Sequence, residues 1–185
     1  MTLSQGYIIS LEVAVPRTLA AVHVRLPVGA VPTAFRRYLD QVYEAERMGC
    51  VELDGQNVFV YRDVPDRPTE ADVAFGVGVR AQFSAVGAVE PTALPVGDVA
   101  TTTHTGSYAK LGAAHDAVID WCRRHGRRRA GVRWEVYGHW TKDESRLRTD
   151  IYHLLEPAAS ESRFGCPTHG SVAMRDTMDA AKTAP

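Results

Sequence analysis

The first half of the chain mixes stretches of strand-like apolar and polar alternation with one stretch in which apolar residues recur every three to four positions. In that stretch Phe35, Leu39 and Val42 share one face of a helix, because about 3.6 residues complete a helical turn. Pro32, near its start, costs little there, since the first turn has no internal partner for its N–H. The pattern predicts strands over residues 8–13, 19–26, 57–61 and 73–79, with a helix from residue 31 to near residue 49.

The second half repeats this order, and an internal repeat of this kind fixes the architecture. Leu94-Pro95 opens the second half as Val15-Pro16 opens the first. A turn at Gly106-Ser107 leads into a helix, and Gly126 suits the position just past its end. The apolar stripe of that helix comprises Leu111, Ala114, Val118, Trp121 and Cys122, and strands are expected over residues 98–104, 132–140 and 147–155.

Each half is a β-α-β-β unit that is too small to bury both faces of its own elements, so the halves are expected to pair. The predicted fold class is α+β, with tandem repeats over about residues 7–81 and 86–156 related by a pseudo-twofold axis. Antiparallel sheets would carry the helices on one side and a ligand groove between the repeats. Residues 1–157 then form one domain, and residues 158–185, rich in Ser, Ala, Thr and Gly, are expected to be a flexible tail.

Composition narrows the class of function. The chain has 185 residues, an apolar content of 45% and a formal charge of -1, which allows a real core and gives no basic field for direct nucleic-acid binding. No stretch is long and apolar enough to span a membrane, and the N-terminus lacks a signal sequence, so we expect a cytoplasmic protein. Three separated cysteines form no zinc or redox motif, and neither a metal nor a cofactor is expected.

The densest group of chemically useful side chains lies in the strand predicted over residues 132–140. Strand alternation places Glu135 and Tyr137 on one face, and Trp134 and Trp140 on the other. If Tyr137 in the second repeat is equivalent to Tyr61 in the first, Glu135 is equivalent to Phe59. One carboxylate would then lie among aromatic rings, which suits a flat aromatic or cationic molecule through stacking, cation–π attraction and charge neutralisation.

Tyr108, Trp140 and Tyr152 complete the candidate ligand-binding residues, with Gly76 and Gly78 leaving room beside Tyr152. Plainer interpretations stay open. The tryptophans fit a core equally well, and Glu135 fits an edge salt bridge to an arginine. The histidines at 104, 115 and 139 are too scattered to indicate a metal site, and the basic run over residues 123–129 suits a solvated helix end.

The second half resembles the GyrI-like small-molecule-binding superfamily, which also supplies effector-binding domains to MerR- and AraC-type transcription regulators. The resemblance spans about residues 6–156. It implies that Glu135 is the acidic residue at the floor of a ligand groove, with Tyr137 two positions on. The chain departs from the family at Leu26-Pro27-Val28, where Gly-Pro-Tyr is common, and lacks Asp-Pro after Tyr137. The residues that carry the resemblance are His104–Tyr108, Ala117–Trp121, Trp134–Tyr137 and Leu147–Tyr152.

Three functions are compatible with this sequence. The first is a binding module that sequesters aromatic or cationic drugs or toxins and gives resistance, in which Glu135 stays ionised. The second, implied by some stand-alone members of the superfamily, is a hydrolase that opens cyclopropane rings of DNA-alkylating natural products, with Glu135 as general base and Tyr137 orienting water. The third is a protein interaction such as gyrase inhibition through the outer surface. A regulator role would need a partner, because both helices belong to the repeats.

Overall fold

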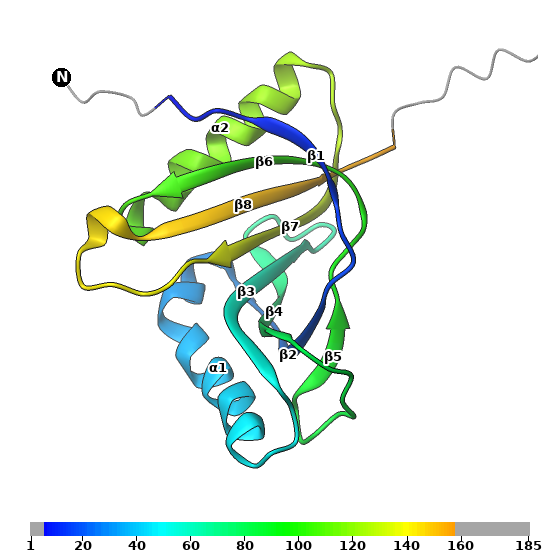
Figure 1. Ribbon diagram of the computed structural model, residues 1–185. Coiled ribbons are helices and arrows are strands. Elements are labelled where there is room, and N and C mark those ends of the chain that lie inside the picture. Colours follow the sequence, from blue (N-terminus) through cyan, green and yellow to red (C-terminus); the bar gives the residue numbers. More distant parts are fainter. Residues whose placement is uncertain (1–5, 158–185) are drawn as a thin grey trace, which may run out of the picture.

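The computed structural model describes residues 6–157, which form one eight-stranded antiparallel sheet and two α-helices (Figure 1). The strands are β1 Ser10–Ala14, β2 Thr18–Pro27, β3 Leu53–Asp63, β4 Glu70–Val79, β5 Glu90–Ala93, β6 Gly97–Thr105, β7 Arg129–Tyr137 and β8 Arg148–Leu155. The helices are α1 Val31–Arg47 and α2 Leu111–Arg124, and single 3-10 turns occupy η1 Val28–Ala30, η2 Tyr108–Lys110 and η3 Glu144–Arg146. The predicted α+β class is confirmed.

The strand order is β1-β6-β8-β7-β3-β4-β2-β5, and the pairing of β3 with β7 joins the two halves of the chain. Read from either end, the order places equivalent strands of the two halves at equivalent positions, which is compatible with a pseudo-twofold repeat. The two outer strands are exchanged between halves. β1 pairs with β6 of the second half, although its residues fall within the sequence range of the first repeat, and β5 pairs with β2 of the first half.

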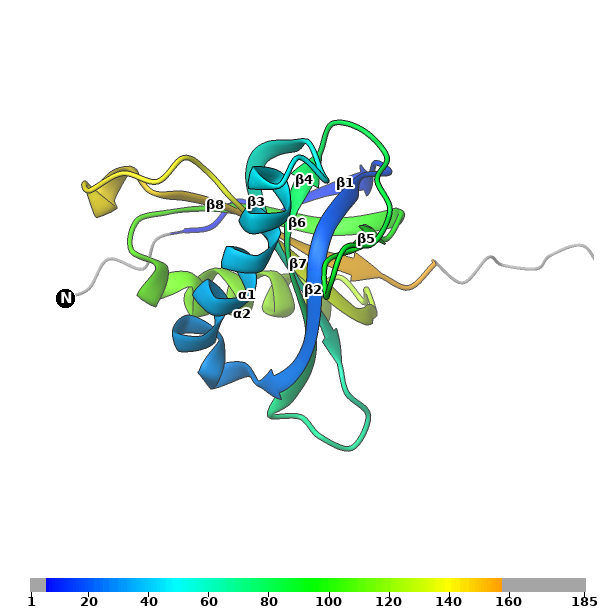
Figure 2. The same ribbon diagram turned by 90° about the horizontal axis from the view of Figure 1, so that it is seen from below.

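Both helices cover the same face of the sheet, and Tyr137 contacts the apolar clusters beneath each of them. Under α1 the core is built around Phe59, Phe75 and Val42, while α2 packs Leu111 and Ala114 against Ile151. Figure 2 shows β2 running across the direction of β6 and β8, so the sheet is strongly twisted. The opposite face has its own apolar cluster drawn from both halves: Leu19, Ala21, Val58, Val60, Ala74, Leu94, Val99, Trp134 and Val136.

The predicted helices match α1 and α2 closely, and Gly126 takes the predicted position past the end of α2, with a φ of 62°. The strand predicted through Trp140 was too long, because β7 ends at Tyr137. The N–H of Gly138 still donates to the carbonyl of Arg148, and the chain then leaves the sheet. The short strand β5 was not predicted. The proposed tail over residues 158–185 lies outside the described residues.

In the described part of the chain, neither helix combines the length and the apolar character needed to cross a membrane.

Candidate functional site

The register of the sheet places Glu135 at the centre of the helix-covered face. Glu135 lies between Phe59 on β3 and Ile151 on β8, its Cα partners on the neighbouring strands. The flanking row on one side contains Tyr61, Arg133 and His153, paired in the same way across the three strands. Because alternate residues of a strand share a face, all these side chains project toward the helices.

Glu135 is 5% exposed, and its carboxylate accepts three hydrogen bonds. The hydroxyls of Tyr61 and Tyr137 both donate to Oε2, at 2.8 and 2.6 Å. Nε2 of His115, on α2, lies 2.8 Å from Oε1. β7 supplies the carboxylate and the phenol of Tyr137, β3 supplies the phenol of Tyr61, and α2 supplies the imidazole. The site therefore depends on the tertiary fold.

These contacts decide the charge of Glu135. Burial opposes ionisation, but the hydrogen bonds from His115, Tyr137 and Tyr61 and the charge of His115 outweigh it, so the pKa of Glu135 lies below its ordinary value. The same burial, together with the negative charge of Glu135, raises the pKa of Tyr61 and of Tyr137 well above that of a free phenol. The cluster therefore holds a carboxylate anion beneath neutral phenols.

His115 bridges Glu135 to a second histidine, because its Nδ1 lies 3.0 Å from Nε2 of His153. A carboxylate only accepts, so His115 donates from Nε2 to Glu135. His153 is 1% exposed, and burial, followed by the charges of His115, Arg129 and Arg133, lowers its pKa to about 2. The three groups form a line, not a convergent set of ligands. Over residues 6–157, no group of three or more His, Cys, Asp or Glu side chains is arranged to hold a metal ion.

A continuous series of aromatic rings leads from α1 to η2 past the carboxylate. Tyr38 stacks on Phe75 with ring centroids 5.2 Å apart, and Phe75 meets Phe59 edge to face at 4.9 Å. Phe59 lies 4.8 Å from Tyr137, which contacts Tyr108 edge to face at 5.4 Å. These are the distances and angles that aromatic pairs prefer. The inner rings are buried, whereas Tyr38, Tyr137 and Tyr108 remain partly exposed.

Thr149 adds an unused polar group beside these rings. It is 0% exposed and pairs across the sheet with Tyr137 on one side and His104 on the other. Among the described residues its hydroxyl has no hydrogen-bond partner. Buried hydroxyls are nearly always hydrogen-bonded, so the hydroxyl of Thr149 is an exception at the edge of the aromatic cluster.

Of the residues predicted from the sequence, Phe59, Tyr61, Glu135 and Tyr137 come together, with Tyr108 against Tyr137. Trp140 does not join them, because it lies beyond the end of β7 and is 71% exposed. Tyr152 lies on the opposite face, where its ring stacks on Trp134 at 5.3 Å. The space beside Gly76, which was expected to lie near Tyr152, is filled by Ala21.

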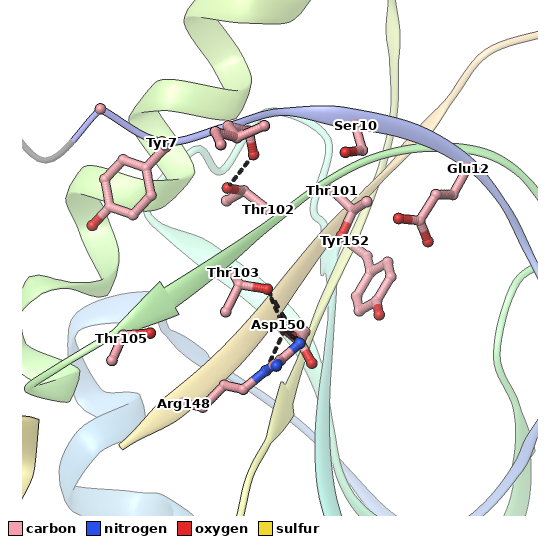
Figure 3. Close-up of a pocket in the computed structure, with 12 residues that line it drawn as sticks. Tyr7, Ser10, Glu12, Thr101, Thr102, Thr103, Thr105, Arg148, Asp150 and Tyr152 are labelled. Atoms are coloured by element: carbon pink, nitrogen blue, oxygen red, sulfur yellow. Dashed lines mark hydrogen bonds and ion pairs between the residues drawn. The ribbon is translucent and has the colours of Figure 1, made fainter. Parts of the chain in front are cut away.

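Tyr152 instead lines a pocket of about 610 Å³ on that opposite face (Figure 3). The pocket is formed mainly by polar side chains of β1, β6 and β8. Glu12 and Asp150 lie on its wall, and Asp150 accepts hydrogen bonds from Thr103 and Arg148. The carboxylate of Asp150 is therefore already neutralised, and Glu135 does not line this pocket.

His115 and His153 were missed as members of the site, although the sequence held a signal for each. His115 lies four residues after Leu111, on the apolar stripe of α2, and His153 alternates with Ile151 and Leu155 on the buried face of β8. A histidine at a core position needs a hydrogen-bond partner. Two such positions on elements that pack together indicate a shared polar network.

The family model for the GyrI-like small-molecule-binding domain matches residues 9–155. The chain belongs to this family. Residues 9–155 include every strand and helix of the sheet, and the Glu135 cluster lies at their centre. Among curated protein sequences, none matches the chain significantly.

Solved structures share the fold at low sequence identity. The crystal structure of the EcmrR C-terminal domain matches with a TM-score of 0.67 and 19% identity, covering 81% of this chain and 98% of that domain. In the EcmrR–DNA complex the match has a TM-score of 0.69 and 17% identity, over 82% of this chain and 58% of EcmrR, so this chain corresponds to little more than half of that protein. SAV2435 bound to tetraphenylphosphonium matches with a TM-score of 0.60 and 9% identity, over 81% of this chain and 94% of SAV2435. A hydrolase from Listeria innocua matches with a TM-score of 0.53 and 10% identity, over 80% of this chain and 91% of the hydrolase.

Proposed function

We propose that this GyrI-like domain binds aromatic organic molecules, cations above all, at the Glu135 cluster, and that it acts by sequestering drugs or toxins. The observation that carries the proposal is an ionised carboxylate, 5% exposed, among Phe59, Tyr61 and Tyr137. An ionised carboxylate in a site of low polarity attracts a cation strongly, and aromatic faces attract organic cations more strongly when water is excluded.

The hydrogen bonds of Glu135 favour a counter-ion over a general base. An efficient base has a pKa near the working pH and an oxygen free to accept the proton. The pKa of Glu135 lies below its ordinary value, and both oxygens already accept hydrogen bonds from Tyr61, Tyr137 or His115. Such a carboxylate stays negative and accepts protons poorly, which suits binding.

A ligand would approach Glu135 past the partly exposed rings of Tyr137 and Tyr108. Tyr137 donates its hydroxyl to the carboxylate, so movement of its ring both uncovers Glu135 and releases one of the oxygen lone pairs. Thr149 pairs with Tyr137 across the sheet, and its free hydroxyl would then face the ligand. The rings of Phe59 and Phe75 would form the apolar wall behind it.

The relatives support the same class of ligand. SAV2435, which shares the fold, binds tetraphenylphosphonium, a bulky aromatic cation. The likeness to EcmrR covers 98% of its C-terminal domain but only 58% of EcmrR in the complex with DNA. That this domain does not itself bind nucleic acid stays a prediction from the sequence.

The test is calorimetric titration of the purified protein with tetraphenylphosphonium. Glu135→Gln keeps the size of the side chain and removes its charge, and we expect it to weaken binding at least tenfold, which corresponds to about 1.4 kcal/mol or more. Glu52→Gln makes the same change at an exposed glutamate and should bind like the wild type. Equal affinities for all three proteins would contradict the proposal.

The hydrolase alternative rests on the likeness to the Listeria innocua protein. Catalysis is distinguished from binding by incubating the protein with a cyclopropane-bearing alkylating compound and following the mass of the product. Addition of one water, lost in Glu135→Gln while binding persists, would make the protein an enzyme with Glu135 as base and Tyr137 as its hydrogen-bond partner. If neither binding nor turnover is found, a protein partner such as gyrase becomes the function to test.

A further inference from the structure

We propose that His115 is an internal cation that competes with the ligand for Glu135, so that the site selects cationic ligands when His115 is neutral and uncharged aromatic ligands when it is protonated. This inference rests on the proposed binding function. It concerns a residue of α2 that was not predicted to belong to the site.

The first basis is position. His115 Nε2 lies 2.8 Å from Glu135 Oε1, which is where the charged group of a cationic ligand would be neutralised. The two side chains are 16% and 7% exposed, so their interaction is poorly screened by water. A protonated His115 would cancel the charge of Glu135, and an incoming cation would have to displace it.

The second basis is that His153 can serve His115 in both charge states. When His115 is neutral, its Nε2–H donates to Glu135, and its Nδ1 accepts from Nε2–H of His153. When His115 is protonated, Nδ1–H donates to Nε2 of His153, which changes tautomer. Because burial lowers the pKa of His153 to about 2, this residue stays neutral and makes either hydrogen bond.

The other groups around His115 do not replace it in this role. The phenols of Tyr61 and Tyr137 stay neutral because burial raises the pKa of each well above its ordinary value. On β7, the guanidinium of Arg133 forms an ion pair with Asp63 at 2.8 Å. The charge of Arg129 contributes to the lowered pKa of His153. On β6, His104 is occupied by Tyr7 and by the carbonyl of Ser107. On α2 itself, the neighbouring Asp116 is exposed to solvent. Among the described residues, His115 is thus the basic side chain in contact with the carboxylate.

Histidine is the side-chain type whose ordinary pKa lies closest to neutral pH. The carboxylate of Glu135, whose pKa lies below its ordinary value, stays ionised there. Binding of a cation at low pH should therefore release one proton, and affinity should rise by up to tenfold per pH unit while His115 is protonated. An uncharged aromatic ligand gains nothing from the loss of that proton, so its affinity should not rise with pH.

The experiment compares tetraphenylphosphonium with uncharged triphenylphosphine oxide at pH 5.5 and pH 8. For the wild type we expect the cation to bind at least about tenfold more tightly at pH 8, and triphenylphosphine oxide to bind no more tightly. His115→Gln keeps a neutral donor to Glu135 and should bind the cation equally at both pH values. His125→Gln, an exposed histidine at the end of the same helix, is the matched control and should behave as the wild type.

Proton release gives a measurement on the wild type alone, in case His115→Gln folds poorly. Calorimetry at pH 5.5 in buffers of different ionisation enthalpy should show close to one proton released per bound cation. Cation binding that is independent of pH, or an unchanged pH dependence in folded His115→Gln, would overturn the role of His115 and leave the binding function intact. If neither compound binds at either pH, the proposed function itself fails.

Discussion

At the scale of single residues, the site combines one buried anion with groups that hold it in place. The carboxylate of Glu135 accepts hydrogen bonds from three directions, from Tyr61, Tyr137 and His115, and each donor comes from a different element of the fold. Such a network is stable only when every member is satisfied. Two residues beside this network can be tested directly. The buried hydroxyl of Thr149 has no hydrogen-bond partner among the described residues, and the pKa of His153 lies far below its ordinary value.

Thr149 should be replaceable without loss of stability. Its buried hydroxyl has no partner among the described residues, so Thr149→Val removes an unpaired polar group and should raise the free energy of unfolding by about 1 kcal/mol. Thr102 on β6 is the matched control, because its hydroxyl donates to the carbonyl of Ile8 at 2.8 Å. Thr102→Val should lower stability by about 1 kcal/mol in the same urea titration. A loss of stability in both variants would show that Thr149 is bonded.

His153 should make the fold sensitive to mild acid. Its pKa is about 2 in the folded protein, below the value of about 6.5 for an unfolded histidine, so the unfolded state binds the extra proton as pH falls below 6.5. Stability is therefore full above that pH and declines toward pH 2. Between pH 7 and pH 5 we expect a loss of about 1 to 2 kcal/mol, measured by urea unfolding.

In His153→Gln most of that loss should disappear, while His139→Gln, at an exposed position, should retain it. An equal acid response in both variants would remove His153 as its cause.

Which residues form the site was only partly predictable. Alternation along β7 correctly placed Glu135 with Tyr137 and opposite Trp134, because one strand fixes its own two faces. Alternation does not show which helix lies above a strand, so the contact between His115 and Glu135 required the fold. Tyr152 and Trp140 lie apart from the Glu135 cluster for different reasons: the first lies on the other face of β8, and the second follows the end of β7.

At the scale of elements, α2 positions His115, and its end is fixed by a glycine. Gly126 has a φ of 62°, which residues with a side chain adopt at a cost. Gly126→Ala should therefore lower the free energy of unfolding by about 1 kcal/mol, measured by thermal or urea unfolding. Gly112, exposed in the first turn of the same helix, has open space around it, and Gly112→Ala should leave stability unchanged or raise it by up to about 1 kcal/mol. Equal effects of the two changes would contradict the assigned helix end.

Elements were easier to predict than their pairing. The helices have clear apolar stripes, and their predicted limits agree with α1 and α2. The exchange of β1 and β5 between halves is invisible to a local pattern, because apolar and polar alternation within one strand does not specify which strand it pairs with. That exchange ties each half to the other at the outer edge of the sheet.

At the scale of the whole molecule, the two halves should unfold as one unit. They share the β3–β7 pairing, the exchanged edge strands and an apolar cluster that contains Leu19 of the first half and Val99 of the second. Circular dichroism, which reports on all the strands, and fluorescence of the tryptophans, which all lie in the second half, should give the same urea midpoint.

Leu19→Ala removes a side chain that is 0% exposed and should lower both midpoints together, at a cost of about 2 to 5 kcal/mol. A shift in the circular dichroism signal alone would mean that the halves are independent.

We propose that the helix-covered face around Glu135, and not the polar pocket beside Tyr152, holds the ligand. The most direct measurement is a crystal structure of the protein with tetraphenylphosphonium. We predict the phosphonium within about 6 Å of the Glu135 carboxylate, the phenyl groups against Phe59 and a displaced Tyr137. Tetraphenylphosphonium bound only in the pocket of Glu12, Asp150 and Tyr152, with the Glu135 network unchanged, would contradict the account.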